Sequence, residues 1–488
     1  MSPCETLTLP SGGSVVDTLP LSLEDYAVTS NGFLPAEPPL ERLPSDYYSP
    51  WESLIESLPT SLAEQTLRSQ VDRLPVLSTD HLASEQEWRR ACVVLGFLAH
   101  AYIWGGDTPA EILPPQITIP FLAASSHLGI PPVASYACVN LWNFRTSTTS
   151  SSNPADLDTL HALQTFTGTE DESWFYMVSV AMEAQGGYII PIMLHALESL
   201  HHHQHHHHQH HHHQHHHHQQ HHQRAAAPYQ TIIESLHKLI HCIGTLGSLL
   251  DRMDERCNPQ IFYHRIRPFL AGSKNMAPAG LPRGVFYDEG EGKGQWRELR
   301  GGSNGQSSLI QFLDLVLGVE HAVQGNSNPE TQKGKEEKVS FHQEVRGYMP
   351  EPHRRFLGFV AERYPGGTRK GVSELLAVGE GEGGRLSQQQ LALRKAFQTA
   401  TKALAEFRNK HLQLVTRYII VPSRQPSGNR GVNLATVSSK LRSSSEMEGR
   451  HGTAEARGEL TGTGGTALLP FLKQSRDETF QAGQLQVR

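Results

Sequence analysis

Apolar residues recur at helical spacing through most of this chain. A short amphipathic piece covers residues 51–58, and the stretch 88–104 is apolar nearly all round, which predicts a buried helix. Residues 172–200 carry a broad apolar stripe that we expect to break near Gly186 and Pro191. Helices are therefore the main elements that the pattern predicts.

Further segments repeat the same spacing, at 229–257, 260–271, 305–322, 341–364, 387–420 and 466–475. Strand patterns with a clean period of two are scarce. We therefore predict a mostly α fold, with a large all-helical domain and a smaller, mainly helical N-terminal domain.

The polar linker at 145–155 suggests where the two domains meet, giving domains of residues 1–150 and 151–488. The first 50 residues are rich in proline and read as an extended arm. Polar, Gly-rich or charged stretches predict flexible loops near 323–339, 365–391 and 423–465.

The tract 201–223 consists almost wholly of His and Gln and supports two interpretations. Clustered imidazoles could bind a metal, which would suit a non-enzymatic haem or metal-binding protein. However, the tract has no apolar face to offset its ordering entropy, so we expect a disordered loop between two helices.

Charge and composition exclude several partners. The net charge of −7 provides no basic field for nucleic acid, and no apolar run approaches the roughly 20 residues that cross a bilayer. The first residues lack the basic region and apolar core that are typical of a signal peptide, so none is expected, and the five cysteines include no CxxC pair. We expect a cytoplasmic monomer that binds neither nucleic acid nor membrane.

His411 lies in the middle of a predicted helix, on the same side as Leu414, Val415 and Tyr418, and Arg408 precedes it by about one turn. A neutral imidazole on an apolar helix face suits a haem iron, and a nearby Arg could pair with a propionate. Taken alone, a lone helical His is more often a core or surface residue.

Phe262 and Arg267 stand five positions apart, so on one regular helix they would diverge by about 140°. They can face one cavity only if the helix ends or kinks before Pro268. Such a cavity would offer a flat apolar contact and a bidentate donor for a carboxylate. The alternative is a solvated Arg beside a core Phe.

Three other features could belong to a site or could be plain structure. The run 301–308 (GGSNGQSS) offers close backbone approach and a helix N-terminus, or simply a capped turn. The glycines of 462–466 suit a lid or a helix-capping loop. Ser179 places a hydroxyl on an apolar helix, where it could equally bond back to the preceding turn.

Six strings carry a family resemblance when they are taken together and in order: WFYMVSVAMEA, NPQIFYHRIRPFLAG, GGSNGQSSLIQFLDLVLG, RGYMPEPHRRFL, FRNKHLQLVTRYIIVPS and GTGGTALLPFLK. They span most of residues 172–473. The chain resembles indoleamine 2,3-dioxygenases, particularly the fungal branch.

On the haem side, the resemblance implies that His411 ligates the iron of one haem b, with Arg408 and Asp314 as the groups that orient it. It also implies that Ser303 lies near a propionate and that the neighbouring Gly302 and Asn304 belong to the cofactor site.

On the substrate side, the matching positions are Phe175, Ser179, Phe262 and Arg267. The resemblance implies that Phe262 packs on the indole, that Arg267 holds the carboxylate, and that Ser179 bonds near the indole N–H or bound oxygen. Further substrate contacts would come from Tyr136, Cys138 and the mobile-loop threonine, Thr463.

The activity implied is cleavage of the indole C2–C3 bond of L-tryptophan with O2 to give N-formyl-L-kynurenine, in tryptophan catabolism and NAD biosynthesis. Haem supplies the oxygen chemistry, so the pocket is expected to contain no strong base. Asn304 departs from the smaller residue common in the family. It leaves open a low-activity paralogue with an altered range of indole substrates.

Overall fold

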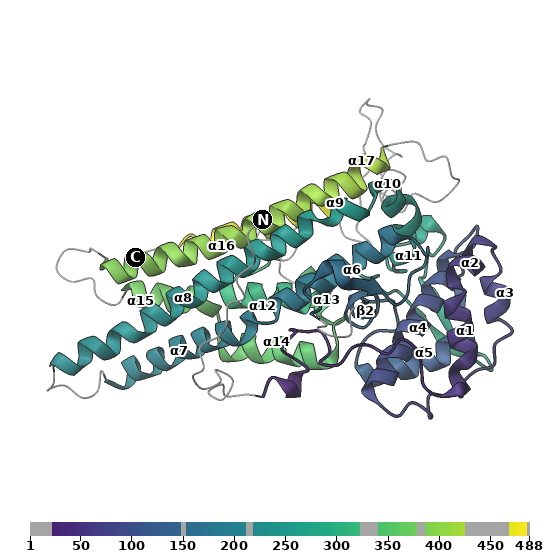
Figure 1. The fold of residues 1–488 in the computed structure, drawn as a ribbon, viewed down its shortest axis with the longest axis horizontal. Coiled ribbons are helices and arrows are strands. Elements are labelled where there is room, and N and C mark those ends of the chain that lie inside the picture. Colours follow the sequence, from purple (N-terminus) through teal and green to yellow (C-terminus); the bar gives the residue numbers. More distant parts are fainter. Residues whose placement is uncertain are drawn as a thin grey trace, which may run out of the picture.

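The computed structural model describes residues 22–147, 153–210, 218–322, 340–377, 386–424 and 468–485. Helices dominate this part of the chain, which confirms the predicted mostly helical fold. The helices between residues 49 and 128 gather at one end of the molecule, at the right of Figure 1. Long helices from the later sequence extend away from that end.

The N-terminal elements surround one buried helix, α4 (Glu85–Trp104). Its N-terminus is capped by Ser84, whose hydroxyl accepts from the backbone N–H of Glu87, and its sides are buried nearly all round, as predicted. A buried ion pair of 2.6 Å between Glu52 and Arg90 ties α1 to it. The helices around it are α1 (Ser49–Glu56), α2 (Leu58–Ala63), α3 (Leu67–Val71) and α5 (Pro115–Leu128).

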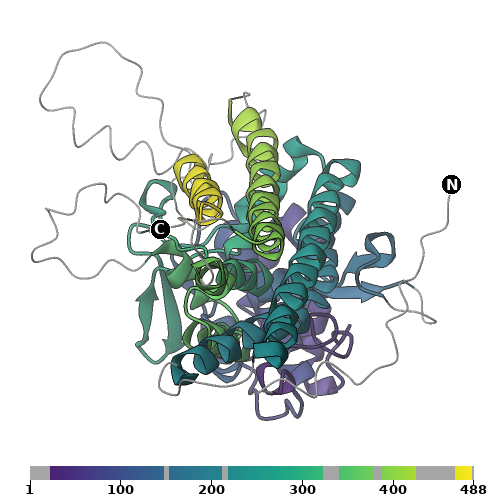
Figure 2. The same ribbon diagram turned by 90° about the vertical axis from the view of Figure 1, so that its left-hand side faces the viewer.

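The later helices form the elongated body of the molecule. Figure 2 views this body end on, with α16 between α8 and the C-terminal helix α19. The helices are α6 (Glu170–Gly186), α7 (Ile189–His210), α8 (His218–Asp251), α9 (Met253–Arg256), α10 (Pro259–Ile261), α11 (Arg267–Leu270), α12 (Ser308–Leu317), α13 (Phe341–Arg346), α14 (Glu351–Arg363), α15 (Gly367–Ala377), α16 (Gln388–Val415), α17 (Val421–Ser423) and α19 (Leu468–Ala482).

Two predicted loops contain helix instead. The segment 365–391 includes α15, because Val372, Leu375 and Leu376 bury one side of it. In the His/Gln tract, α7 continues to His210 and α8 begins at His218, while 211–217 lie outside the described residues. Both helices contain apolar segments outside the tract, and extending an existing helix costs far less than starting one.

Prolines break two predicted helices. The predicted helix 341–364 is interrupted by Gly347 and Pro350, so that α13 and α14 form in its place. The predicted helix 260–271 divides into α10, one turn of π-helix (Phe262–Ile266) and α11. Two more π turns occur, at Ala137–Leu141 and at Thr416–Ile420 after α16.

A small sheet is the departure from an all-helical body. Strand β4 (Val285–Gly290) pairs antiparallel with β5 (Lys293–Arg297) and parallel with β1 (Ile112–Leu113). A separate hairpin joins β2 (Phe144–Thr146) to β3 (Leu160–Ala162). Both sheets join strands from either side of the expected boundary at 145–155, and the two-domain division stays a prediction.

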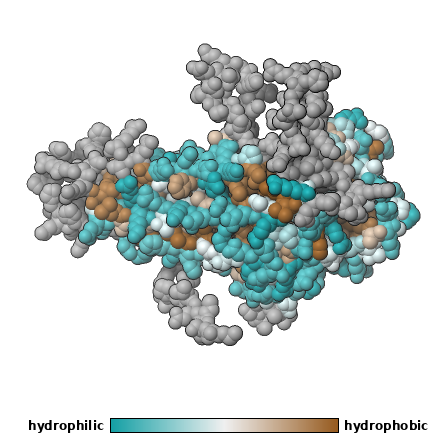
Figure 3. All heavy atoms as spheres, turned by 90° about the horizontal axis from the view of Figure 1, so that it is seen from above, coloured by the Kyte–Doolittle hydropathy of each residue, from teal (hydrophilic) through white to brown (hydrophobic). Residues whose placement is uncertain are grey.

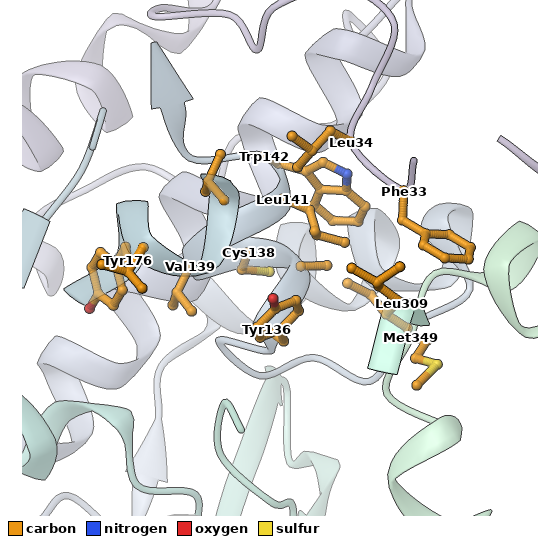
Figure 4. Close-up of a cluster of buried hydrophobic side chains, with 14 of the residues drawn as sticks. Phe33, Leu34, Tyr136, Cys138, Val139, Leu141, Trp142, Tyr176, Leu309 and Met349 are labelled. Atoms are coloured by element: carbon orange, nitrogen blue, oxygen red, sulfur yellow. The ribbon is translucent and has the colours of Figure 1, made fainter. Parts of the chain in front are cut away.

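The junction of the two regions is filled by a cluster of large apolar side chains. Figure 4 shows Phe33 and Leu34 from the N-terminal segment meeting Tyr136, Leu141 and their neighbours around the first π turn. Tyr176 from α6 and Leu309 from α12 complete this cluster. The core is therefore continuous from the N-terminal elements into the helical body.

The polar residues lie mainly on the outer surface, and the cysteines are buried. The face on the α16 side is largely hydrophilic, with hydrophobic residues in separate patches (Figure 3). The four cysteines within the described ranges are free and buried. Over these ranges no single helix is long and apolar enough to cross a membrane, and α6 with α7 reaches that length only as a pair bent by 42°.

The predicted break at Gly186 and Gly187 allows the N-terminal segment to approach the helix backbone. A Cβ on Gly187 would lie 2.4 Å from the backbone nitrogen of Gly32. We expect Gly187→Ala to lower the free energy of unfolding by roughly 1–3 kcal/mol, because backbone would have to move. Urea denaturation followed by circular dichroism measures this.

The matched control is Gly244→Ala on α8. This glycine is exposed, and a Cβ there would meet nothing within 4 Å. Since Ala is the better helix former, the control should keep or raise stability, by up to about 1 kcal/mol. Equal effects of the two substitutions would contradict the packing argument.

Candidate active site

One cavity brings together predicted residues that are far apart in sequence. Its walls come from α6, α12, α16, α19, the three π turns and the loop before α12. The predicted substrate-side residues that line it are Tyr136, Phe175, Ser179, Phe262 and Arg267. The predicted cofactor-side residues that line it are Gly302, Ser303, Asn304, Arg408 and His411.

The π turn before α11 solves the problem of spacing at Phe262 and Arg267. The backbone N–H of Arg267 bonds to the carbonyl of Phe262, five residues earlier, in place of the α-helical four. Residues five apart therefore come onto the same side. This is the local break that the sequence required, and Pro268 follows it directly.

Aromatic side chains form one wall of the cavity. The rings of Phe175 and Phe262 lie with centroids 4.6 Å apart at a tilt of 43°, and Tyr418 meets Phe262 edge-on at 5.7 Å. Tyr418 is itself held by its hydroxyl, which donates to the carbonyl of Cys257 at 2.6 Å. This wall offers a flat, apolar contact for a ring.

Arg267 is almost fully buried, with 3% of its surface exposed. Burial lowers the pKa of its guanidinium to about 10, only partly opposed by the neighbouring Tyr263, whose ring centre lies 5.6 Å away. The charge is therefore held at a desolvation cost, which an anionic ligand in the cavity would offset. A carboxylate matches its planar fork of donors.

His411 presents a neutral imidazole to the cavity. Burial, with a smaller effect from Arg408, lowers the pKa of its ring to about 4. Within the part of the chain that the structure describes, this ring makes no hydrogen bond. Its nitrogen lone pair is thus available to a metal at neutral pH.

Arg408 is fixed by a buried ion pair one turn from His411. Both of its bonds to the Asp314 carboxylate measure 2.7 Å, and this pairing keeps the pKa of Asp314 well below its usual range despite burial. Asp314 does not line the cavity itself, so it acts through Arg408. The pair thereby fixes α12 to the helix that carries His411.

His321 extends this network to the C-terminal helix. Its ring nitrogens bond to Asp314 at 3.1 Å and to Glu478 on α19 at 2.6 Å. These carboxylates raise the pKa of His321 above its ordinary value, although burial opposes them.

Asp314, His321 and His342 also place possible metal ligands within 4.8 Å of one another. However, the rings of His321 and His342 stack nearly parallel, 3.7 Å apart, so their lone pairs do not converge on one point. We interpret the cluster as an ion-pair network that holds α19 against the cavity.

The glycines before α12 allow two backbone segments of the protein to pack closely together. A Cβ on Gly301 would lie 2.0 Å from the carbonyl oxygen of Leu270, next to the end of α11. This close contact joins the loop to the segment of Arg267. The Ser303 hydroxyl caps the following 3-10 turn, and Asn304 is exposed to solvent while lining the cavity.

Two predicted substrate residues are not placed in the cavity. Cys138 is fully buried with its sulfur 3.3 Å from that of Cys92, because the π turn directs Val139 and Asn140 to the cavity in its place. Thr463 lies outside the described residues.

This cavity also contains a carboxylate that was not predicted. Glu183 lies on α6, four residues after Ser179, and lines the cavity although no base was expected there. The sequence could have indicated this residue, because an acidic side chain within an apolar helical segment is unusual. Leu468 and Phe471 of α19 also line the cavity without having been predicted as site residues.

Comparison with known proteins places the chain beside one family. The family model described as indoleamine 2,3-dioxygenase matches residues 22–482. The indoleamine 2,3-dioxygenase of Saccharomyces cerevisiae is 37% identical over 464 residues, covering 94% of this chain and 92% of the relative. That of Penicillium citrinum is 36% identical over 473 residues, covering 95% and 89%.

A third relative differs in the substrate that its name gives. The 6-hydroxytryptophan 2,3-dioxygenase of Fusarium equiseti is 34% identical over 470 residues, covering 96% of this chain and all of the relative. Proteins of similar overall likeness to this chain therefore carry names with different indole substrates.

The ion pair beside His411 generates a stability prediction. We expect Asp314→Asn to lower the free energy of unfolding at pH 7 by about 3–5 kcal/mol, because Arg408 would keep a buried charge without its partner. The control Glu406→Gln removes an exposed pair with Lys402 on α16 and should change little.

The effect should depend on pH. A carboxyl whose folded pKa is depressed adds stability above its unfolded pKa, about 4, and loses it as the pH falls through the folded value. The gap between wild type and Asp314→Asn should therefore narrow below about pH 4. Urea midpoints at pH 7, at about pH 4 and at about pH 2.5 measure it, and a gap that stays constant down to the lowest pH would refute the ionised pair.

Proposed function

Since the chain belongs to the indoleamine 2,3-dioxygenase family, we propose that it is a haem-dependent enzyme that opens the indole ring of L-tryptophan with O2. The product would be N-formyl-L-kynurenine. The observation that carries this proposal is one cavity that holds both the neutral imidazole of His411 and the buried guanidinium of Arg267.

The residues present fit a haem group. The His411 ring faces the cavity uncharged and without a hydrogen bond to the described residues, so a ring nitrogen is available to ligate iron. Asp314 and Arg408 would keep the helix of His411 in place, and the Ser303 hydroxyl lies at the cavity where it could meet a propionate. When bound, haem iron would supply the oxygen chemistry.

The protein's own part would be binding and orientation. The rings of Phe175 and Phe262 would hold the indole plane, and Arg267 would take the carboxylate as a bidentate partner. Ser179 is 7% exposed, and its hydroxyl would accept a hydrogen bond from the indole N–H. The largely apolar lining would exclude water from the reacting ring.

A second candidate within the same family is an enzyme with another range of indole substrates. It is favoured by Asn304, which lines the cavity, and by the relative named for 6-hydroxytryptophan. Comparing kcat/KM for L-tryptophan and ring-hydroxylated tryptophans decides between the two. A clear preference for the hydroxylated substrate would select the second candidate.

The cofactor prediction concerns His411→Ala. We expect this variant to purify with little haem, because the cavity would lose its only proposed iron ligand. The ratio of Soret to protein absorbance measures this. His237→Ala, an exposed histidine on α8, should keep wild-type haem content. Full haem content in His411→Ala would exclude His411 as the ligand.

The substrate prediction concerns Arg267→Met. We expect the affinity for L-tryptophan to fall by about 10²–10³-fold, the effect of losing a buried charged partner worth about 3–4 kcal/mol. Spectral titration of the haem-loaded protein measures binding. Tryptamine lacks the carboxylate, so it should bind wild type and variant alike. Equal losses for both ligands would mean that Arg267 only supports the fold.

A further inference from the structure

Glu183 is a buried acid that was not predicted as a site residue and that has no role in the proposed mechanism. Its side chain is 1% exposed, and its Oε1 accepts hydrogen bonds from the hydroxyls of Tyr136 at 3.0 Å and Ser307 at 2.6 Å. Its other oxygen, Oε2, is buried and has no hydrogen-bond partner in the described part of the chain. Half of the carboxyl group is therefore unsatisfied.

No charge compensates this carboxyl group. From the segment before the first π turn, the titratable neighbour is the Tyr136 phenol, whose own pKa burial raises well above its usual range. From α12, the neighbour is the uncharged Ser307. Among the described residues, no Lys, Arg or His contributes to the pKa shift of Glu183. An ionised carboxylate in this setting would be costly.

Glu183 joins three elements that shape the cavity. It stands on α6, Tyr136 precedes the first π turn, and Ser307 is the N-cap of α12, accepting from the backbone N–H of Ile310. The Ser179 hydroxyl lies close enough to the Tyr136 phenol to oppose the rise in its pKa that burial causes. Figure 4 shows Tyr136 within the same cluster as Leu309 of α12.

The direction of these bonds affects the predicted substrate contact. If Glu183 accepts from Tyr136, the Tyr136 oxygen is free to accept from the Ser179 hydroxyl. Ser179 then presents a lone pair to the cavity, as an acceptor for an indole N–H requires. Glu183 thus determines that Ser179 faces the cavity as a hydrogen-bond acceptor, although Glu183 itself does not contact the substrate.

We propose that Glu183, in its neutral acid form, is a positioning residue that orients Tyr136 and Ser179 for binding of the indole substrate. This inference rests on the proposed function. Burial raises the pKa of Glu183 to about 7, although its bonds from Ser307 and Tyr136 partly oppose the shift. A ligand that displaces water from the cavity would disfavour the ionised form further.

The test compares wild type with Glu183→Gln as haem-loaded proteins, by spectral titration with L-tryptophan from pH 6 to about 8.5. The amide keeps an acceptor for Tyr136 and Ser307 but cannot ionise. We expect the wild-type Kd to rise above about pH 7, approaching tenfold per pH unit, and the ratio of wild-type to variant Kd to rise with it.

A second measurement uses no ligand. The folded pKa of Glu183 is raised, so its contribution to stability is full below about 4.5 and is lost as the pH rises to about 7. The thermal midpoint of wild type should therefore fall relative to Glu183→Gln across that interval. A midpoint difference that does not change with pH would overturn the buried neutral acid.

The outcomes separate this inference from the function on which it rests. Parallel Kd profiles for wild type and Glu183→Gln would overturn the role of Glu183 alone, because L-tryptophan would still bind. A haem-loaded wild type that binds no L-tryptophan at any pH would overturn the proposed function and this inference with it. Soret absorbance of each sample verifies that the compared proteins carry equal haem.

Discussion

The cost of holding polar groups in an apolar cavity governs this structure. Burial lowers the pKa of His411 to about 4 and that of Arg267 to about 10, and it raises that of Glu183 to about 7. In each group the charged form is disfavoured, as desolvation requires. Asp314 stays ionised because Arg408 pairs with it at 2.7 Å. The same cavity therefore keeps the His411 imidazole neutral and holds the Arg267 guanidinium at a desolvation cost.

Local π turns in the backbone decide which side chains face this cavity. The three π turns found in the described residues all border the cavity, through Val139 at the first, Phe262 at the second and Tyr418 at the third. Each bonds residues five apart and so rotates the following side chains relative to a regular helix. For this reason Cys138 faces Cys92 and not the cavity, whereas Phe262 and Arg267 line the same cavity.

The resemblance to a known family and the helical spacing predicted much of what the structure contains. The helical fold, the buried helix 88–104 and the break at Gly186 followed from local pattern, because apolar periodicity and glycine act over a few residues. The helix at 367–377 was missed because its glycines and charges resemble a loop, and the pairing of β1 with β4 was missed because its partners lie about 170 residues apart.

By itself, the sequence determined which residues could do chemistry: an imidazole on an apolar helix face, an arginine before a proline and a serine on a buried helix. Only the tertiary structure decided which of them share one cavity and what their surroundings do to them. Glu183 is the clearest example, since its burial against Tyr136 and Ser307 comes from three separate elements. A pKa depends on what surrounds a group in space, and no local pattern encodes that environment.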